Sequence, residues 1–248
     1  MNIAFKTLLY REVKRFLNVY NQTIIAPIIN CVLYFVIFSV IFKKDGLHQQ
    51  VFIASGIIMM SVLQNAYANT QSTITTAKVL GFLVDFIIPP ISIKNLLFAI
   101  FFSGIIRGLI VAILGFITLS IFVNFHFYNI FLMFCYIFFA AGIFSFLGII
   151  VGSVSKNFDS AMSYNTYIIM PVTFLSGTFY SVKMLSAFWQ KVIAFNPVFY
   201  IIDGFRYSII GTKEAEISSF ATLSILSIVL ILMGLIAYCF MKKKYHEI

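Results

Sequence analysis

Residues 78–95 read KVLGFLVDFIIPPISIKN, a stretch almost as apolar as a membrane-spanning helix. Its helical part is short, because the eleven residues from Lys78 to Ile88 are followed by Pro89-Pro90. Eleven residues extend about 16 Å as a helix, whereas the hydrocarbon core of a bilayer is about 30 Å thick. Proline lacks the backbone donor and disfavours the helical conformation of the residue before it. We therefore predict a short helix that ends at the prolines and does not cross the membrane.

The side chains of this stretch are distributed as an interfacial helix requires. Its polar positions recur at steps of three, four and seven residues and form one narrow stripe: Lys78, Gly81, Asp85 and Ser92. Its apolar positions cover a wide face: Leu80, Leu83, Val84, Ile87 and Ile88. Residues 78–92 are expected to lie along the membrane boundary, either as a purely structural interfacial helix or as a helix that docks into a groove of a partner protein.

The composition of the whole chain is that of an integral membrane protein. It has 248 residues, of which 61% are hydrophobic and 10% charged, with a mean hydropathy of +1.02. A soluble domain is nearer one quarter charged. Long apolar runs favour helices, because backbone groups in lipid are satisfied within a helix, whereas a barrel shows short alternating strands. The fold class is therefore all-α and membrane-embedded.

Six apolar segments have the length of a membrane span, about 20 residues. They are Thr23–Phe42, Val51–Asn69, Leu96–Val123, Ile130–Val151, Met162–Phe179 and Phe220–Met241. Comparison of the first three with the last three reveals no convincing internal repeat. No polar linker separates domains, so residues 1–248 are expected to form one membrane domain.

The distribution of basic residues predicts the orientation. With the N-terminus in the cytoplasm, ten Lys and Arg residues lie inside, six lie outside, and Arg107 falls within a span. Basic residues concentrate on the cytoplasmic side of membrane proteins, so both termini are expected to be cytoplasmic. The same rule explains the net charge of +9 without nucleic acid, which is not expected as a partner.

The first 21 residues are predicted to form an amphipathic helix on the membrane surface. Apolar side chains recur at helical steps, and a basic face is formed by Lys6, Arg11, Lys14 and Arg15. A signal peptide is disfavoured, because the following apolar run is long and has no cleavage site of small residues.

A second irregular segment, residues 180–211, precedes the last predicted span. Its apolar pieces are short, and Asn196-Pro197 interrupts it. Its aromatic residues suit the outer membrane interface. Asp203 and Arg206 are three residues apart and are expected to pair on one helix face. We predict a re-entrant hairpin of two short helices.

The two irregular segments, in this order, resemble those of the permease subunits of type-2 ABC exporters. The local matches are GFLVDFIIPPIS at residues 81–92 and NPVFYIIDGFRY at residues 196–207, with FLSGTFYSV at residues 174–182. The resemblance covers nearly the whole chain, from the N-terminal amphipathic helix to the hairpin before the sixth span. The coupling segment here carries only one acidic residue, Asp85, fewer than is usual in the family.

This resemblance implies a partner ATPase and a second permease copy, with which the chain is expected to form a homodimer in the bacterial inner membrane. It makes residues 78–92 a coupling helix, with contacts from Lys78, Leu80, Gly81, Leu83, Val84, Asp85, Ile87, Ile88 and Pro89. It gives the N-terminal cations Lys6, Arg11, Lys14 and Arg15 a further contact with the ATPase, and it places Asn196, Pro197, Asp203 and Arg206 in the outer hairpin.

No ATP site is expected in this chain, because the dipeptide Gly-Lys, which every P-loop contains, does not occur. ATP and Mg²⁺ would be bound by the partner, and the chain is expected to be a transport subunit and not an enzyme. Arg107 is the one charge deep within a predicted span and is a candidate for the translocation pathway. It could instead extend to the membrane boundary or pair with a carbonyl group.

Two other classes are disfavoured by missing residues. A stand-alone secondary transporter or channel usually needs intramembrane carboxylates, and the six predicted spans contain no Asp or Glu. A membrane-embedded enzyme needs a cluster of His, Cys or carboxylate groups, and the sequence shows none. The apolar spans favour an amphiphilic or lipid-linked substrate, and membrane lipid as a partner, without selecting one compound.

Overall fold

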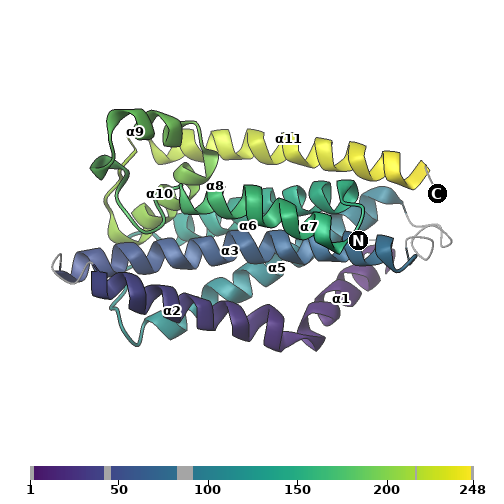
Figure 1. Cartoon of the computed structure of the whole chain (residues 1–248), viewed down its shortest axis with the longest axis horizontal. Helices are drawn as coiled ribbons and strands as arrows, with labels where there is room; N and C mark the ends of the chain where they lie inside the picture. The colour runs from purple at the N-terminus through teal and green to yellow at the C-terminus, as the bar shows by residue number, and fades with distance from the viewer. Residues whose placement is uncertain (1–2, 42–45, 83–91, 216, 247–248) are drawn as a thin grey trace.

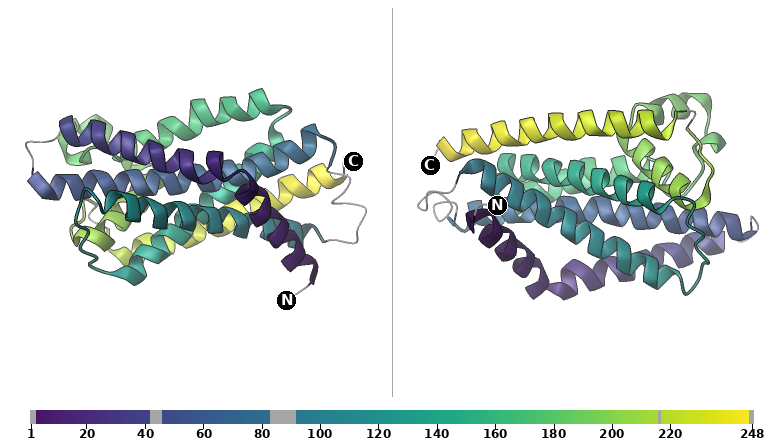
Figure 2. Two further views of the ribbon diagram at one scale, coloured as in Figure 1. Left: turned by 90° about the horizontal axis from the view of Figure 1, so that it is seen from below. Right: turned by 180° about the vertical axis from the view of Figure 1, so that it is seen from behind.

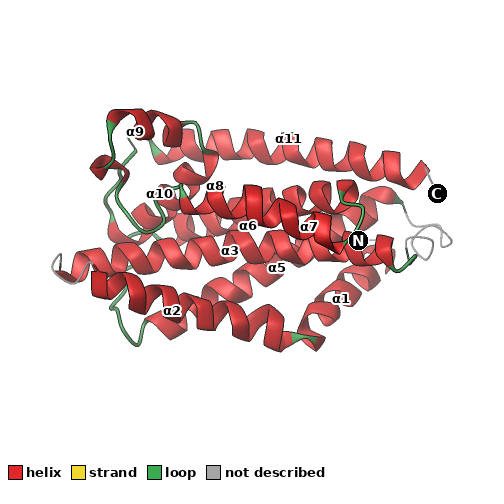
Figure 3. Ribbon diagram, in the orientation of Figure 1, coloured by secondary structure: helices red, strands yellow, loops and turns green. Residues whose placement is uncertain are grey.

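The computed structural model describes residues 3–41, 46–82, 92–215 and 217–246, and every regular element in these ranges is helical (Figure 3). The long helices are α2 (Ala26–Ile41), α3 (Gly46–Val79), α5 (Ile93–Leu119), α6 (Ile130–Val154) and α11 (Ser219–His246). Figures 1 and 2 show them side by side in one elongated bundle. The predicted all-α class is confirmed.

Five described segments are long and apolar enough to cross a membrane. They are Asn21–Ile41, Gln49–Val79, Ile93–Leu119, Ile130–Val154 and Ser219–Lys243. The predicted span Met162–Phe179 has a different form. Here α7 (Phe158–Tyr164), the π-helix Asn165–Ile169 and α8 (Met170–Phe174) follow one another without a break, and a turn comes next.

The two ends of the bundle differ. Figures 1 and 2 place both chain termini toward one end, here called the terminal end. The short helices α9 (Ala187–Ala194) and α10 (Pro197–Ile210) lie at the other, here called the hairpin end. These two helices occupy the segment for which the sequence predicts a hairpin. The N-terminal helix α1 (Ile3–Asn18) meets α2 at a sharp bend and packs against α5.

Helix α3 is the centre of the fold and is longer than the sequence predicts. It packs on α5, α6, α2 and α10, and most of it is buried. The predicted span ended at Asn69 because the sequence becomes polar there. The helix continues to Val79 because polar side chains of this part are bonded to neighbouring helices, for example Asn69 to Ser103 and Thr70 to the Ser145 carbonyl.

Helices α3 and α6 approach each other closely, and this approach depends on glycine. A Cβ atom at Gly148 of α6 would lie 2.1 Å from Thr70 Oγ1 and 2.4 Å from the Tyr67 carbonyl oxygen. Small residues allow helix backbones to approach in this way within membranes, where contact between packed atoms drives association. α3 and α6 therefore form one rigid pair.

A short sequence motif that occurs twice, outside any long repeat, explains two irregular helices. Asn-x-x-Ile-Ile-x-Pro occurs at residues 21–27 and again at residues 165–171, and each copy opens with a π-helix. In both, the residue before the proline donates its N–H to the asparagine carbonyl five residues earlier. A proline ring clashes with the carbonyl four residues before it in an α-helix, and the wider π-turn relieves that clash.

Substitution of Gly148 by alanine is expected to lower the stability of the fold by about 1–3 kcal/mol, because backbone atoms of α3 cannot move away from the added methyl group. Thermal unfolding in detergent, followed by size-exclusion chromatography, measures this. Gly115→Ala is the matched control, because its Cβ would meet only the Ile58 side chain, at 3.4 Å. Equal unfolding temperatures for the two variants would contradict the proposed close contact.

Candidate functional site: a polar column and a hairpin anchor

One face of α3 carries a column of polar side chains at intervals of four residues: Ser61, Asn65, Asn69 and Thr73. All four are buried. The column begins beside α2, where Cys31 Sγ and Ser61 Oγ are 2.9 Å apart, and Asn65 Nδ2 donates to the Ser61 carbonyl at 2.9 Å. Four-residue spacing keeps side chains on one helical face, so these groups form a continuous line toward the terminal end.

Arg107 joins this column from α5. Its Nη2 donates to Asn65 Oδ1 at 2.8 Å, and the residue is only 7% exposed. Its Nε has no hydrogen-bond partner within the described part of the chain. The only salt bridges among the described residues involve Glu12, so Arg107 is a buried cation without a bonded counter-ion. Arg107 therefore points into the protein and does not extend to the boundary.

The next position, Asn69, connects three helices. Its Nδ2 donates to Ser103 Oγ of α5 at 2.9 Å, and its backbone carbonyl accepts from Arg15 Nη2 of α1 at 3.0 Å. Arg15 Nη2 also donates to Thr73 Oγ1. The amphipathic helix is thus bonded directly to the polar column.

Glu12 completes this connection and is the residue that sequence reasoning missed. It is 1% exposed and accepts from Arg11 at 2.7 Å, from Arg15 at 3.1 Å and from Thr73 Oγ1 at 3.0 Å. The signal was present in the sequence. Glu12 lies four residues after Leu8 and four before Phe16, the two buried apolar side chains of α1, and therefore on the inward face.

The four N-terminal cations divide into two kinds. Lys6, Arg11 and Lys14 are exposed, as a contact with a partner or a lipid surface requires. Arg15 is 35% exposed, and its guanidinium group is bonded to α3 and Glu12. Arg11, Glu12 and Arg15 also line a pocket of about 390 Å³, which continues along Thr73, Thr76 and Ala77 to Phe82.

The predicted coupling segment is described only at its beginning. Lys78 is in the last turn of α3, and its Nζ donates to the carbonyls of Ser153 and Ser155 at the end of α6. Leu80 and Gly81 form the following turn, with Gly81 in the left-handed conformation (φ 77°). The remaining predicted contacts lie outside the described residues: Leu83, Val84, Asp85, Ile87, Ile88 and Pro89.

At the hairpin end, Asn196 and Pro197 begin α10. Asn196 Oδ1 accepts from the Val198 N–H at 3.0 Å, and Pro197 occupies the first turn, where a missing donor costs nothing. The amide of Asn196 donates to the Val172 carbonyl at 3.1 Å and to Ser176 Oγ at 2.8 Å. The asparagine therefore both starts α10 and binds it to the end of α8.

Arg206 anchors the hairpin to α3. It is 2% exposed and donates to the carbonyls of Gly177 (3.1 Å), Thr178 (3.2 Å) and Phe52 (3.3 Å), with its guanidinium carbon 3.4 Å from the centre of the Phe52 ring. Gly56 leaves room for this contact, since a Cβ there would be 2.8 Å from Arg206 Nη2. Three carbonyl groups thus replace the solvation of the buried cation.

Asp203 has a separate role, and the predicted pair with Arg206 is not formed. The two side chains make no salt bridge, because each is bonded to a different loop. The Asp203 carboxylate accepts from the backbone N–H groups of Glu214 at 2.9 Å and Ala215 at 3.1 Å. Burial raises the pKa of Asp203, and these two hydrogen bonds act in the opposite direction. Asp203 therefore fixes the connection from α10 to α11.

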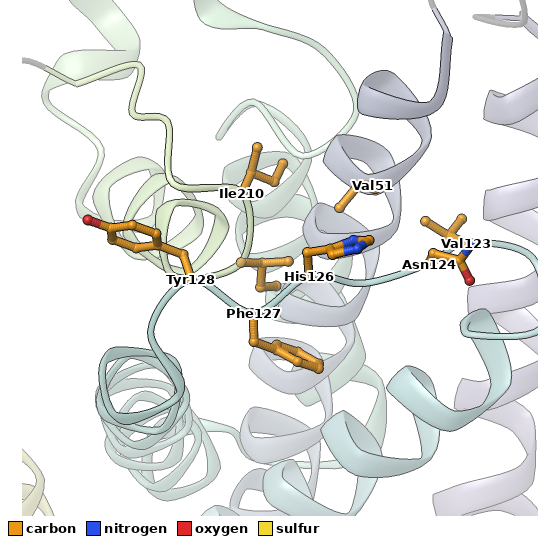
Figure 4. A pocket seen from close by; sticks show the side chains of 8 residues that line it. Val51, Val123, Asn124, His126, Phe127, Tyr128 and Ile210 are labelled. Carbon is orange, nitrogen blue, oxygen red and sulfur yellow. The ribbon is translucent and has the colours of Figure 1, made fainter.

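A pocket of about 460 Å³ also lies at the hairpin end, beside the connection between α5 and α6. Figure 4 shows side chains of this connection, including Asn124, His126, Phe127 and Tyr128, with Val51 of α3 and Ile210 of α10. No group of three His, Cys, Asp or Glu residues that could hold a metal ion occurs within the described ranges. The pocket is lined mostly by apolar and aromatic groups and contains no catalytic arrangement.

Comparison with known proteins identifies the family. A family model described as ABC-2 type transporter matches residues 3–210, which contain the polar column and the hairpin anchor. The chain belongs to the ABC-2 type transporter family. The predicted resemblance to a type-2 ABC permease is confirmed, and the chain is a multi-pass permease of the inner-membrane type.

Two relatives illustrate the range of this ABC-2 family. The inner membrane transport permease YadH of Escherichia coli K12 is 31% identical over 246 residues, covering 97% of this chain and 95% of YadH. Nodulation protein J of Rhizobium leguminosarum biovar viciae is 32% identical over 74 residues, 30% of this chain and 29% of that protein. The similarity to YadH extends over both ends of the bundle.

The substitution Glu12→Gln is expected to weaken the attachment of α1 to α3 by about 2 kcal/mol, less than for a fully buried pair because Arg15 is partly exposed. Trypsin cleavage after Lys14 and Arg15 should then become at least about tenfold faster, since cleavage follows local opening. Lys6→Gln, which changes an exposed cation of the same helix, is the control. Equal cleavage rates for Glu12→Gln and the unchanged chain would contradict the attachment.

Proposed function

We propose that this chain is the membrane-spanning permease subunit of an ATP-driven ABC exporter, with six spans and both termini in the cytoplasm. The match to the ABC-2 family over residues 3–210 carries the proposal. ATP hydrolysis is assigned to a separate ATPase, because the sequence lacks the Gly-Lys dipeptide of a P-loop. The permease acts as a homodimer, and the terminal end of the bundle faces the ATPase.

Helix α3 supplies the mechanical connection in this proposal. Its 34 residues correspond to about 51 Å, more than the thickness of the hydrocarbon core. At the terminal end it is bonded to α1 and leads into the proposed coupling helix, residues 78–92. At the hairpin end its Phe52 carbonyl accepts from Arg206. A displacement imposed by the ATPase at one end of this helix is passed to the hairpin anchor at the other.

The proposed substrate is an amphiphilic or lipid-linked molecule, and Arg107 is the residue proposed to act along its path. A buried cation without a bonded counter-ion attracts an anionic group. A charge at such depth is costly to bury and is therefore rare outside functional sites. The alternative is a stand-alone secondary transporter. None of the five candidate spans contains Asp or Glu, the residues that such transporters usually use for ion coupling.

Copurification tests the proposal most directly. The tagged chain, expressed in its native host, should retain an ABC ATPase whose hydrolysis rate depends on the permease. Purification of the folded chain without any ATPase, together with substrate transport driven by an ion gradient alone, would establish the secondary-transporter alternative.

The charge reversal Asp85→Arg tests the coupling helix. It should lower permease-dependent ATP hydrolysis at least about tenfold, because one charge contact of a desolvated interface is replaced by repulsion. Lys94→Glu, a charge reversal outside the proposed contact set, is the control and should leave hydrolysis unchanged. If hydrolysis by the copurified complex is unaffected by Asp85→Arg, the segment is only an interfacial helix.

The substitution Arg107→Ala tests the translocation pathway. It should abolish stimulation of ATP hydrolysis by amphiphilic substrates while the amount of folded complex in the membrane stays normal. Arg107→Lys keeps the positive charge and should retain part of the stimulation. Full stimulation of ATP hydrolysis in Arg107→Ala would show that Arg107 is not part of the translocation pathway.

A further inference from the structure

An apolar groove runs along the surface of α6, in the gap between α8 and α11. It has a volume of about 480 Å³ and is lined by α6, by the π-helix and α8, and by α11. The junction of α9 and α10 closes it at the hairpin end (Figure 1). Representative lining side chains are Leu147, Ile169, Val172, Phe195 and Met233.

The groove offers no free polar group to water or to a polar ligand. Among the described residues, Asn196 is its one polar lining residue. Both ends of that amide are used, because Oδ1 accepts from the Val198 N–H and Nδ2 donates to the Val172 carbonyl and Ser176 Oγ. A ligand of this groove therefore has to be apolar, as a hydrocarbon chain is.

An empty groove of this kind is unfavourable in a membrane protein. Side chains that face a void lose dispersion contacts, and no hydrophobic effect draws two helices together across lipid to close the gap. The volume lies within the range of small-molecule sites in proteins, about 300–1,000 Å³. The surrounding bilayer supplies hydrocarbon chains that can fill it.

The rim of the groove at the hairpin end carries positive charge and aromatic side chains. Lys191 is exposed and directly precedes the lining residue Val192, while Phe188 and Trp189 are exposed on the same helix. Residues 180–200 contain two lysines and no acidic residue. Trp and Tyr lie at membrane interfaces, and each basic residue near the surface attracts anionic lipid. The groove thus combines an apolar interior with a cationic rim.

We propose that this groove holds an acyl chain of an anionic phospholipid from the surrounding bilayer, with the lipid phosphate beside Lys191. The acyl chain fills the gap between α8 and α11. The lipid thereby supports the helix that carries the second Asn-x-x-Ile-Ile-x-Pro motif. This site depends on the chain being embedded in a membrane and is independent of the proposed ATP-driven export.

Photolabelling in lipid nanodiscs tests the proposal. The full-length chain is reconstituted with phosphatidylglycerol or phosphatidylcholine that carries a diazirine within one acyl chain, and labelled residues are mapped by mass spectrometry. Labelling at Ile169, Val172 and Met233 should be about fivefold higher with phosphatidylglycerol, as expected for one lysine near an anionic headgroup. Leu232 and Ile236, exposed on α11 and outside the set of groove-lining residues, should be labelled equally by both lipids.

Two variants separate the headgroup site from the groove. Lys191→Gln should remove the preference for phosphatidylglycerol at the groove positions. Lys156→Gln, an exposed cation in the connection between α6 and α7, is the matched control and should leave the preference intact. Met233→Trp fills the groove and should abolish labelling at Ile169 while labelling at Ile236 persists. If Met233→Trp elutes as an aggregate, Leu147→Phe is used in its place to fill the groove.

Three outcomes would overturn the proposal. If the groove positions and the control positions are labelled to the same extent, the lipid contact is that of ordinary annular lipid and not of a specific site. Equal labelling of the groove by both lipids would show that the groove does not prefer an anionic headgroup and that Lys191 does not bind one. Crosslinks between two copies at Val172 and Met233 in place of lipid labels would make a second copy the occupant.

Discussion

The structure depends on a constraint that the bilayer imposes, namely that polar groups within it find their partners inside the protein. α3 shows how this is met. Its four-residue polar column is satisfied by α1, α2 and α5, and its opposite face is close enough to α6 for Thr70 to donate to the Ser145 carbonyl. Because lipid cannot replace these bonds, the arrangement of four helices around α3 is fixed by hydrogen bonding as well as by shape.

At the hairpin end, polar and charged groups likewise find their partners inside the protein. Asn196, Asp203 and Arg206 lie on or beside α10, and each binds a different segment: the end of α8, the connection to α11, and the turn after α8 together with α3. The three polar residues thus fix the position of a short helix that packs on α6 and α3. Such a cluster holds a non-spanning element in place while α3 remains continuous.

Much of the fold could be predicted from apolar runs, since five of the six predicted spans lie almost entirely within the five long apolar helical segments of the structure. The errors arose where polar residues were interpreted by composition alone. The polar sequence around Asn69 predicts the end of a span there, although its bonds to Ser103 and Arg15 keep it buried. The spacing of Asp203 and Arg206 predicts an ion pair, although backbone groups from distant loops are their partners. Such partners depend on tertiary packing, which sequence spacing does not reveal.

The paired π-helices have a consequence for how the chain tolerates changes in length. A π-turn holds one residue more than the α-turn it replaces, so each Asn-x-x-Ile-Ile-x-Pro segment stores a single inserted residue at a fixed depth in the bundle. Deletion of that residue, with a return to an ordinary α-turn, would leave the following helix in nearly the same orientation. An α-turn that kept the residue would turn the following helix by about 100° relative to the preceding one. The two segments therefore set the rotational phase of α2 and α8, and with it the side chains that these helices present to the bilayer.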